Sequence, residues 1–422
     1  MDAAVLFGTF FILLFLSVPI GYAIGISSLV AIYLYSDIPL VIIAQNAIAG
    51  VDSFPLLAIP FFMLAGNLMS SGGIAKRLVD FFNALFGHIT GGLGIVTVIV
   101  CMFFAAISGS AVATVSAVGA FMIPEMVKHG YNKSFSAALT AAAGTIGVII
   151  PPSIPFVIYG VVSGTSITKM FTAGFLPGLM MGLALIIVCY FVSKKNGYKG
   201  KETRSTGPEI MKAFKDAFWA ILSPVIILGG IYSGFFTPTE AAVISVVYSF
   251  IVGVFVYREL DTKGAYKSFK DAIVVNGSTT FMVGFSTVFA AFLTMAQIPN
   301  AIAGLITGMT DNKFLILLII NIFLLIVGMF IDNIPATIIL TPILLPICMS
   351  YGMNPVTFGI MLTMNLAIGF CSPPYGINLF VASSISKVSI EELTKSIIKP
   401  LIGLIIVLLL ITYLPVLTTM FI

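Results

Sequence analysis

The amino-acid sequence predicts an all-α polytopic membrane protein. Of its 422 residues, 59% are apolar and 9% are charged, whereas soluble domains have roughly 45–50% apolar and about 25% charged residues. Apolar runs of about 20 residues recur along the chain, which is the length that a helix needs to cross a bilayer. A transmembrane barrel would show alternating segments of about 10 residues instead. These observations exclude a soluble domain, a disordered chain and a barrel.

Crossing helices are expected wherever an apolar run is long enough to span the membrane. Pro19 and Gly21 favour a break within 4–36, and one long tilted helix is the alternative there. The expected crossings are 4–20, 21–36, 54–71, 135–163, 170–192, 218–235, 239–256, 272–297, 356–384 and 400–420.

Two further apolar regions, 94–128 and 314–350, are interrupted near the middle. The interruptions are the polar runs Ser108–Ser110 and Asp332–Pro335. Each half holds about 14–17 residues, which is too short to cross comfortably. Both regions are therefore expected to form re-entrant helical hairpins.

Basic residues predict the orientation, because Lys and Arg concentrate in cytoplasmic loops. If 193–217 and 257–271 face the cytoplasm, only Lys169 and Lys313 of the 20 Lys and Arg lie outside. Both chain ends are then external. The external loops expected to contact a soluble partner are 37–53, 232–240 and 298–313.

The polar connection 193–217 divides the chain into halves that share landmarks. Five landmarks match between residues 222 positions apart, and Pro and Gly are the residues that define backbone breaks. The expected topology makes the two repeats inverted. Inverted repeats with interrupted helices are typical of secondary transporters, which bind substrate and ions near the midplane between the repeats. The landmarks are Pro124 with Pro346, Gly130 with Gly352, Asn132 with Asn354, Gly147 with Gly369, and Pro151-Pro152 with Pro373-Pro374.

Polar chemistry is expected at the two hairpin tips and at the Pro-Pro segments 147–153 and 369–375. Non-helical backbone inside a bilayer is tolerated only where protein or water satisfies it. A Pro-Pro pair frees carbonyl oxygens of the preceding turn. Carbonyls with a hydroxyl can hold sodium, and helix N-termini favour an anion. The alternative for each pair is a kink that only shapes a helix.

Asp332 is the only acidic residue between Lys313 and Glu391. A charge at the bilayer centre costs at least about 2.5–3.5 kcal/mol, so such a residue usually faces a cavity and acts on ions or substrate. The alternative is a hairpin tip that reaches water without a function. Ser110 and Ser153 are weaker candidates, because serine in membrane helices often bonds only to backbone.

The sequence lacks the residues that several other classes of membrane protein would need. No GxxxxGKS or GxxxxGKT sequence occurs, which argues against direct ATP drive. An intramembrane hydrolase using Ser108 or Ser110 would need a buried histidine as its base. The two histidines of the sequence, His88 and His129, are expected in or beside cytoplasmic loops. The small net charge of +4 favours no nucleic-acid partner. The chain is therefore expected not to be an enzyme, and a passive channel would not need paired broken helices.

Five sequence blocks resemble the large membrane subunit of tripartite ATP-independent periplasmic (TRAP) transporters, with sialic-acid members as the first guess. The resemblance covers essentially the full length, and the two Pro-Pro blocks are its specific part. A looser similarity in fold extends to divalent-anion/sodium symporters and arsenite-type transporters. The blocks are SFPLLAIPFF (53–62), SGSA (108–111), GTIGVIIPPS (144–153), TPTEA (237–241) and PPYGINLF (373–380).

The resemblance implies an elevator mechanism driven by Na⁺, in which a transport domain with both hairpins slides against a scaffold. It also implies a location in the bacterial inner membrane and uptake of sialic acid or a C4-dicarboxylate. The implied partners are a small four-helix membrane subunit and a periplasmic substrate-binding protein. The alternative is a stand-alone Na⁺/anion symporter of the divalent-anion symporter fold. The implied domains are 1–93 (scaffold helices and arm), 94–163 (first transport repeat), 164–313 (scaffold helices, loop 193–217 and second arm), 314–385 (second transport repeat) and 386–422 (C-terminal helix).

Two sodium sites and a substrate site are also implied by the resemblance. Since Asp332 would repel an anion, it is expected to hold a substrate hydroxyl or amine unless sodium intervenes. The first sodium site would consist of Ser108 and the carbonyls of Gly147, Ile150 and Pro152. The second, by repeat symmetry, would consist of Gly328, Gly369, Ser372 and Tyr375. The substrate contacts would be Ser108, Ser153 and Asp332.

Overall fold

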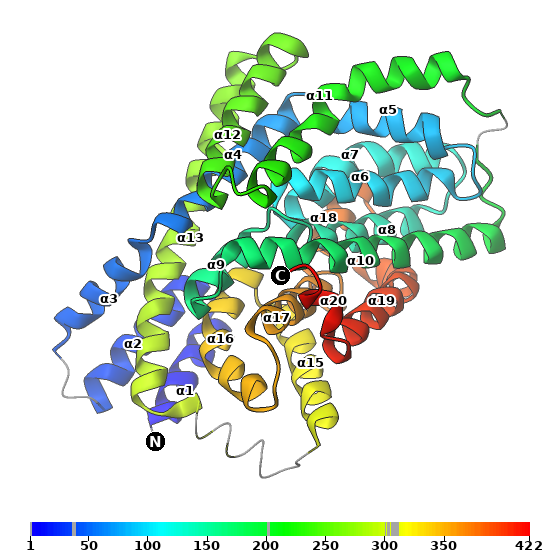
Figure 1. Ribbon diagram of the computed structural model, residues 1–422. Coiled ribbons are helices and arrows are strands. Elements are labelled where there is room, and N and C mark those ends of the chain that lie inside the picture. The colour runs from blue at the N-terminus through cyan, green and yellow to red at the C-terminus, as the bar shows by residue number, and fades with distance from the viewer. Residues whose placement is uncertain (1, 36–38, 201–202, 300, 302–303, 305–311) are drawn as a thin grey trace.

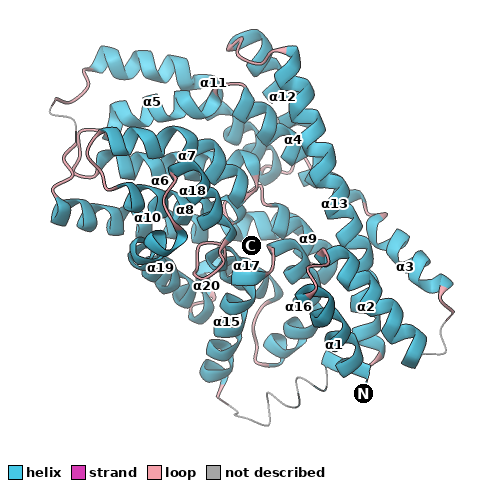
Figure 2. Ribbon diagram, turned by 180° about the vertical axis from the view of Figure 1, so that it is seen from behind, coloured by secondary structure: helices cyan, strands magenta, loops and turns pink. Residues whose placement is uncertain are grey.

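The computed structural model describes residues 2–35, 39–200, 203–299, 301, 304 and 312–422. Throughout these residues the chain forms helices joined by loops, without a strand (Figure 1, Figure 2). Nine of the described helices are long and apolar enough to cross a membrane. The predicted all-α polytopic membrane fold is therefore confirmed.

One group of helices, called here the scaffold body, is built around the long helix α13. Helices α2, α3 and α4 all pack on α13, α1 packs on α2, and α12 packs on α4 (Figure 1). The amphipathic helix α5 lies along α11. The members are α1 (Asp2–Phe15), α2 (Ile20–Tyr35), α3 (Val41–Val51), η1 (Phe54–Leu57), α4 (Ala58–Ser71), α5 (Ile74–Phe86), α11 (Gly207–Tyr232), α12 (Pro238–Ile251), the π-helical η3 (Val252–Val256) and α13 (Thr262–Met295).

The second group, called the hairpin body, contains both interrupted hairpins and both Pro-Pro segments. Its core consists of α8 and α17, whose side chains are almost all buried. The members are α6 (Gly92–Ser108), α7 (Ala111–Lys128), α8 (Lys133–Gly144), η2 (Thr145–Val148), α9 (Ile154–Ser163), α10 (Ile167–Asn196), α15 (Lys313–Phe330), α16 (Asn333–Ser350), α17 (Pro355–Gly369), α18 (Ile377–Ser386), α19 (Ile390–Tyr413) and α20 (Val416–Thr419).

Helix α10 packs on α6, α9, α17 and α19, whereas the sequence-based division counted it with the scaffold in 164–313. Glycines on one face of α10 explain this contact. A Cβ atom at Gly174 would lie 2.8 Å from the carbonyl oxygen of Ile149, and one at Gly178 would lie 2.3 Å from the Ile150 side chain. Small residues at four-residue spacing let membrane helices approach closely. Helix α19 packs on α8, α10 and α17, so it also lies with the hairpin body.

The polar connection expected at 193–217 is shorter in the structure, because α10 continues to Asn196 and α11 begins at Gly207. A capping box starts α11: the backbone N–H of Thr206 donates to the Glu209 carboxylate at 2.7 Å. Residues 207–217 are too polar for an apolar crossing, so the sequence placed them in the connection. They form the first turns of an amphipathic helix instead.

Helix α13 also begins earlier than expected, at Thr262, because the Asp261 side chain caps it by accepting from the Gly264 N–H at 2.7 Å. The expected external loop 37–53 contains α3. Helix α3 has 11 residues, fewer than the about 20 that a membrane-crossing helix needs, so the lengths of the apolar runs did not predict it. Most of the expected external loop 298–313 lies outside the described residues.

The predicted backbone breaks are present. Helix α1 ends at Phe15 and α2 begins at Ile20, so 4–36 forms two helices. The hairpin halves have 17 residues in α6 and 18 residues in each of α7, α15 and α16. Helix α6 lies at the upper limit of the expected 14–17 residues, and the other three exceed it by one residue and are long enough to cross a membrane. The re-entrant course of both hairpins stays a prediction.

Helix boundaries in the two halves coincide at the offset of 222 residues. Helix α7 begins and ends 222 positions before α16, and the side chains of Asn132 and Asn354 cap α8 and α17. Gly130 and Gly352 have φ values of 83° and 75°, which only glycine adopts without strain. The Pro151-Pro152 and Pro373-Pro374 bonds are both cis. The opposite orientation of the two units stays a prediction.

Candidate functional site

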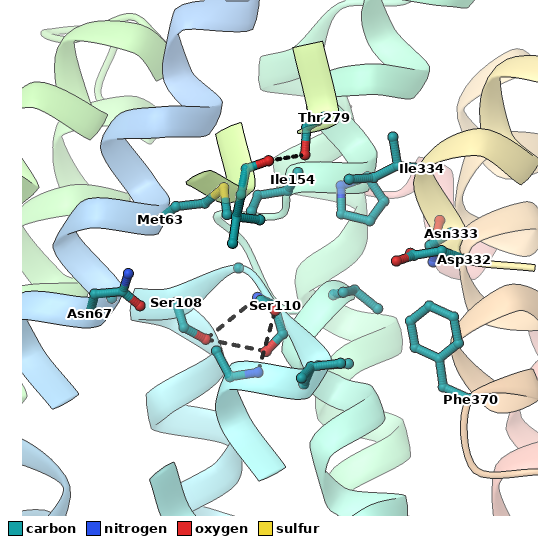
Figure 3. A pocket seen from close by; sticks show the side chains of 18 of the residues that line it. Met63, Asn67, Ser108, Ser110, Ile154, Thr279, Asp332, Asn333, Ile334 and Phe370 are labelled. Atoms are coloured by element: carbon teal, nitrogen blue, oxygen red, sulfur yellow. Dashed lines mark hydrogen bonds between the residues drawn. The ribbon is translucent and has the colours of Figure 1, made fainter. Parts of the chain in front are cut away.

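A cavity of about 370 Å³ lies between the two bodies and contacts both hairpin tips. Helices α4 and α13 form one wall, and the tips with the start of α9 form the other. Figure 3 shows Ser108 and Ser110 on one side of this space and Asp332 with Asn333 across from them. The lining residues are Met63, Gly66, Asn67, Ser108–Ala113, Val148, Ile154, Pro155, Asp271, Val275, Thr279, Asp332–Ile334 and Phe370.

The first tip is a tight turn with several oxygen atoms close together. Gly109 has φ 61°, and Ser110 caps α7 by accepting from the Ala113 N–H at 3.4 Å. The Ser108 hydroxyl lies 3.1 Å from the Thr114 hydroxyl. Thr114 in turn donates to the carbonyl oxygen of Ser110 at 2.8 Å. The turn therefore holds a cluster of hydroxyl and carbonyl oxygens, in which Ser108 and Ser110 line the cavity and Thr114 is buried behind them.

This tip lies directly against the first Pro-Pro segment. A Cβ atom at Gly147 would lie 2.6 Å from the Ser110 carbonyl oxygen and 2.7 Å from the Thr114 hydroxyl. A Cβ atom at Gly109 would lie 2.8 Å from the carbonyl oxygen of Pro152. Ser108, Gly147 and Pro152 of the expected first sodium site are thus brought together. Ile150 belongs to the same segment, and its side chain packs on α10.

Two oxygen atoms of this cluster, the Ser110 carbonyl and the Thr114 hydroxyl, were missed by the sequence analysis. Their signal is helical spacing: Thr114 follows Ser110 by four residues, so its side chain folds back to the open end of the turn. The residue 222 positions after Thr114 is Ala336. The second repeat therefore lacks this hydroxyl, and symmetry did not point to it.

The second expected sodium site is built on a close backbone contact. A Cβ atom at Gly369 would lie 2.3 Å from the carbonyl carbon of Gly328 and 2.7 Å from its oxygen. The Ser372 N–H donates to the Gly369 carbonyl at 3.0 Å, and its hydroxyl donates to the Ile368 carbonyl at 2.8 Å. Gly328, Gly369 and Ser372 thus come together. The Tyr375 side chain is exposed and its ring lies against the rings of Phe330 and Phe380.

Asp332 precedes α16 at the second tip, and its side chain is exposed. It borders the main cavity and also a second hollow of about 500 Å³ next to the turn between α1 and α2. Its neighbour Asn333 is buried, and the Asn333 amide oxygen accepts from the Thr337 hydroxyl at 3.1 Å. Among the described residues, the amide nitrogen of Asn333 has no hydrogen-bond partner. A ligand in the cavity would therefore meet a carboxylate and an amide at this tip.

Ser153 is fully buried and does not line the cavity, unlike the other two expected substrate contacts. Its hydroxyl donates to the carbonyl oxygen of Val148 at 2.6 Å and accepts from the Phe156 N–H at 3.3 Å. It therefore caps α9 in this conformation. The next two residues, Ile154 and Pro155, reach the cavity in its place.

The charge pattern of the cavity is unusual for an anion site. Its side chains include two carboxylates, Asp271 and Asp332, and no Lys, Arg or His among the described residues. Three helices begin at its wall: α7, α9 and α16. Helix N-termini carry partial positive charge and free N–H groups, so they attract anions. The site can thus bind an anion at helix ends beside oxygen clusters that suit a monovalent cation.

Known proteins resemble this chain over nearly all its length. The model of the family "Tripartite ATP-independent periplasmic transporter, DctM component" matches residues 7–417. An isethionate TRAP transporter permease protein, DctMQ, of Oleidesulfovibrio alaskensis is 47% identical, covering 97% of this chain and 65% of the relative. The chain thus spans just under two thirds of that relative's length.

Two relatives of similar length are named as transporters of other substrates. A solved structure has a similar fold. The sialic acid TRAP large permease SiaM of Vibrio cholerae is 40% identical, covering 96% of this chain and 94% of the relative. The C4-dicarboxylate TRAP large permease DctM of Rhodobacter capsulatus is 36% identical, covering 98% and 97%. The YdaH transporter of Alcanivorax borkumensis matches with a TM-score of 0.65 at 12% identity, over 88% of this chain and 86% of that one. The chain therefore belongs to the DctM component family of tripartite ATP-independent periplasmic transporters, and is a transporter subunit and not an enzyme.

Proposed function

We propose that this subunit carries a small organic anion into the cell, coupled to an inward Na⁺ gradient, across the bacterial inner membrane. The observation that supports this most is the cavity between the bodies. It is bordered by both hairpin tips, by the start of α9 and by scaffold helices α4 and α13. Anion-attracting helix ends and the oxygen cluster around Thr114 lie side by side there, so one movement can carry both ions.

The substrate we propose is a hydroxylated organic anion. Asp332 can accept a hydrogen bond from a substrate hydroxyl, but it repels a second carboxylate, and the described cavity lining offers no cationic side chain to offset that repulsion. The relatives are named for isethionate, sialic acid and C4-dicarboxylates. Isethionate combines one sulfonate with one hydroxyl, and sialic acid combines one carboxylate with several hydroxyls. Succinate has two carboxylates and no hydroxyl, so it suits this cavity less well.

An elevator movement of the hairpin body against α4 and α13 is the mechanism we propose. The cavity is lined by residues 63–67, past the midpoint of the expected crossing 54–71, and by residues 271–279, at the start of the expected crossing 272–297. On the expected topology these are the cytoplasmic halves of both crossings, because Lys76 follows α4 and Lys263 lies at the start of α13. This conformation would therefore be inward-facing, and the reverse movement would carry both tips toward the external side.

We further propose that the subunit works with a small membrane subunit and a periplasmic substrate-binding protein. The family name and the term "large permease" among the relatives support this. The test is uptake of radiolabelled isethionate, sialic acid and succinate into proteoliposomes. Each substrate is measured with and without a Na⁺ gradient, the small subunit and the binding protein.

Uptake of a hydroxylated anion is expected only when Na⁺ and all three proteins are present, with succinate near background. Uptake by this chain alone would support the alternative of a stand-alone symporter. Full uptake after the Na⁺ gradient is replaced by a K⁺ gradient would contradict Na⁺ coupling. Preference for succinate would contradict the proposed role of Asp332.

Thr114→Val is expected to raise the Na⁺ concentration needed for half-maximal uptake about tenfold, because one neutral oxygen contact is worth about 1–1.5 kcal/mol. The methyl group keeps the volume of the side chain. The matched control is Thr97→Val on α6, where the hydroxyl donates to the Leu93 carbonyl at 2.8 Å far from the tip. An unchanged Na⁺ dependence in Thr114→Val would remove Thr114 from the cation site.

A further inference from the structure

The side chain of Asn378 connects the second repeat to the first. Asn378 is the second residue of α18, the helix that follows the second Pro-Pro segment and packs on α7 and α8. The side chain is fully buried, and its amide donates to the carbonyl oxygen of Ala141 on α8 at 3.1 Å. Asn378 and Ala141 are 237 positions apart in the chain. This hydrogen bond therefore depends on the packing of the two repeats against each other.

In the first repeat, the accepting carbonyl lies where α8 ends and the first Pro-Pro segment begins. In a continuous α-helix, the N–H of Thr145 would donate to the carbonyl of Ala141. Here that N–H donates to the carbonyls two and three residues earlier, because the chain tightens into the 3₁₀ turn η2. The Asn378 amide supplies a donor to Ala141 instead. Since η2 contains Gly147, the bond is made next to the expected first sodium site.

In the second repeat, the backbone of Asn378 closes the second Pro-Pro segment. Its N–H donates to the carbonyl oxygen of Phe370 at 2.9 Å. The N-cap residue Gly376 lies so close that a Cβ atom there would be 2.9 Å from the carbonyl oxygens of Phe370 and Ser372. Phe370 directly follows Gly369. The position of Asn378 therefore depends on the conformation of the expected second sodium site.

Packing alone does not account for an amide at position 378. The Asn378 side-chain oxygen has no hydrogen-bond partner among the described residues. A buried unpaired polar atom costs free energy, which an apolar side chain of similar size would avoid. The residue 222 positions earlier is Phe156, so the first repeat has no equivalent amide. Repeat symmetry therefore does not account for the bond to Ala141 either.

We infer that Asn378 couples the two Pro-Pro segments, so that Na⁺ bound at one segment favours binding of Na⁺ at the other. An ion that orders the first segment fixes the Ala141 carbonyl, and the amide bond then holds Asn378 in the position that closes the second segment. Such coupling acts equally in both directions. Asn378 is thus a positioning residue that acts through Ala141 and Phe370. The inference rests on the proposed Na⁺ coupling and its two expected sodium sites.

A double-mutant cycle with a local readout tests the inference. Cys371 is buried in the second Pro-Pro segment, so its reaction with a thiol probe reports the opening of that segment. Labelling of Cys371 in the full chain in nanodiscs is followed by mass spectrometry of peptides, and the Na⁺ concentration that halves its rate is determined. Thr114→Val perturbs the first site, and Asn378→Leu removes the amide. The unmodified protein, both single variants and the double variant are compared.

Thr114→Val is expected to raise this Na⁺ concentration about threefold when Asn378 is present, and to leave it unchanged in the Asn378→Leu background. Threefold is about the effect of one interhelical hydrogen bond in a membrane. Thr97→Val is the matched control for the first change and is expected to cause no shift. Asn321→Leu is the control for the second change. Asn321 is buried and accepts from the Asn365 amide at 2.8 Å within the second repeat, so its loss is expected to keep the threefold shift.

Asn378→Asp is measured beside Asn378→Leu in case the apolar variant does not fold. A carboxylate keeps the shape of the side chain but only accepts hydrogen bonds, and the first turn of a helix tolerates its charge. The threefold shift is expected to disappear in this variant as well. A shift that persists in both variants, or no shift while Asn378 is present, would overturn the inference and leave the two sodium sites independent. Labelling of Cys371 that Na⁺ never slows would instead contradict the second sodium site itself.

Discussion

Asp332→Ala is expected to reduce uptake to background while the protein still inserts into the membrane and assembles. The side chain is exposed to the cavity and makes no ion pair among the described residues, so its removal leaves no buried charge behind. A hydrogen bond to a charged group contributes about 1.5–3 kcal/mol, which corresponds to roughly a 10- to 100-fold loss of substrate affinity. Uptake of a hydroxylated anion into proteoliposomes measures the effect.

Asp332→Asn serves as the conservative variant. The amide keeps a hydrogen-bond acceptor and removes the charge, so partial uptake is expected for a hydroxylated substrate. Because the repulsion of a second carboxylate is also removed, succinate uptake is expected to rise relative to the unmodified protein. Normal uptake by Asp332→Ala would exclude Asp332 from the substrate site and leave the tip with a purely structural role.

Gly369→Ala is expected to destabilise the hairpin body and to abolish transport. The added Cβ would lie 2.3 Å from a backbone atom of Gly328, so α15 and α17 would have to separate. Overpacking of this kind costs about 1–3 kcal/mol. The same movement would open the expected second sodium site, so stabilisation by Na⁺ is expected to disappear as well.

Thermal unfolding followed by thiol labelling measures this effect. Cys101, Cys189, Cys348 and Cys371 are all buried in the hairpin body, so they react with a thiol probe only when it opens. The control is Gly229→Ala on α11, where a Cβ would meet nothing within 4 Å. A variant at position 369 that keeps its melting temperature and its Na⁺ response would show that α15 and α17 can move apart freely.

Backbone breaks were predictable because they depend on local chemistry. Proline lacks an N–H and glycine tolerates positive φ, so Pro-Pro pairs and Ser-Gly-Ser interrupt an apolar helix whatever surrounds them. The matched landmarks anticipated helix boundaries that coincide at one offset, as the shared caps Asn132 and Asn354 show. Helix ends in polar stretches were less predictable. The starts of α11 and α13 depend on caps such as Asp261, and a hydropathy search does not detect them.

Composition and spacing alone were enough to predict a helical transporter with two interrupted repeats, because bilayer thickness and proline geometry act on the sequence directly. Only the tertiary structure decided which residues meet. Thr114 meets the first Pro-Pro segment because the first tip lies against Gly147, and Ser153 turns inward as a cap and does not line the cavity. Helix α10 lies with the hairpins because Gly174 and Gly178 let it approach the first Pro-Pro segment. The contacts of Thr114 with Gly147 and of α10 with the first Pro-Pro segment join residues far apart in the chain, and their energies depend on packing across the whole body, which no local pattern records.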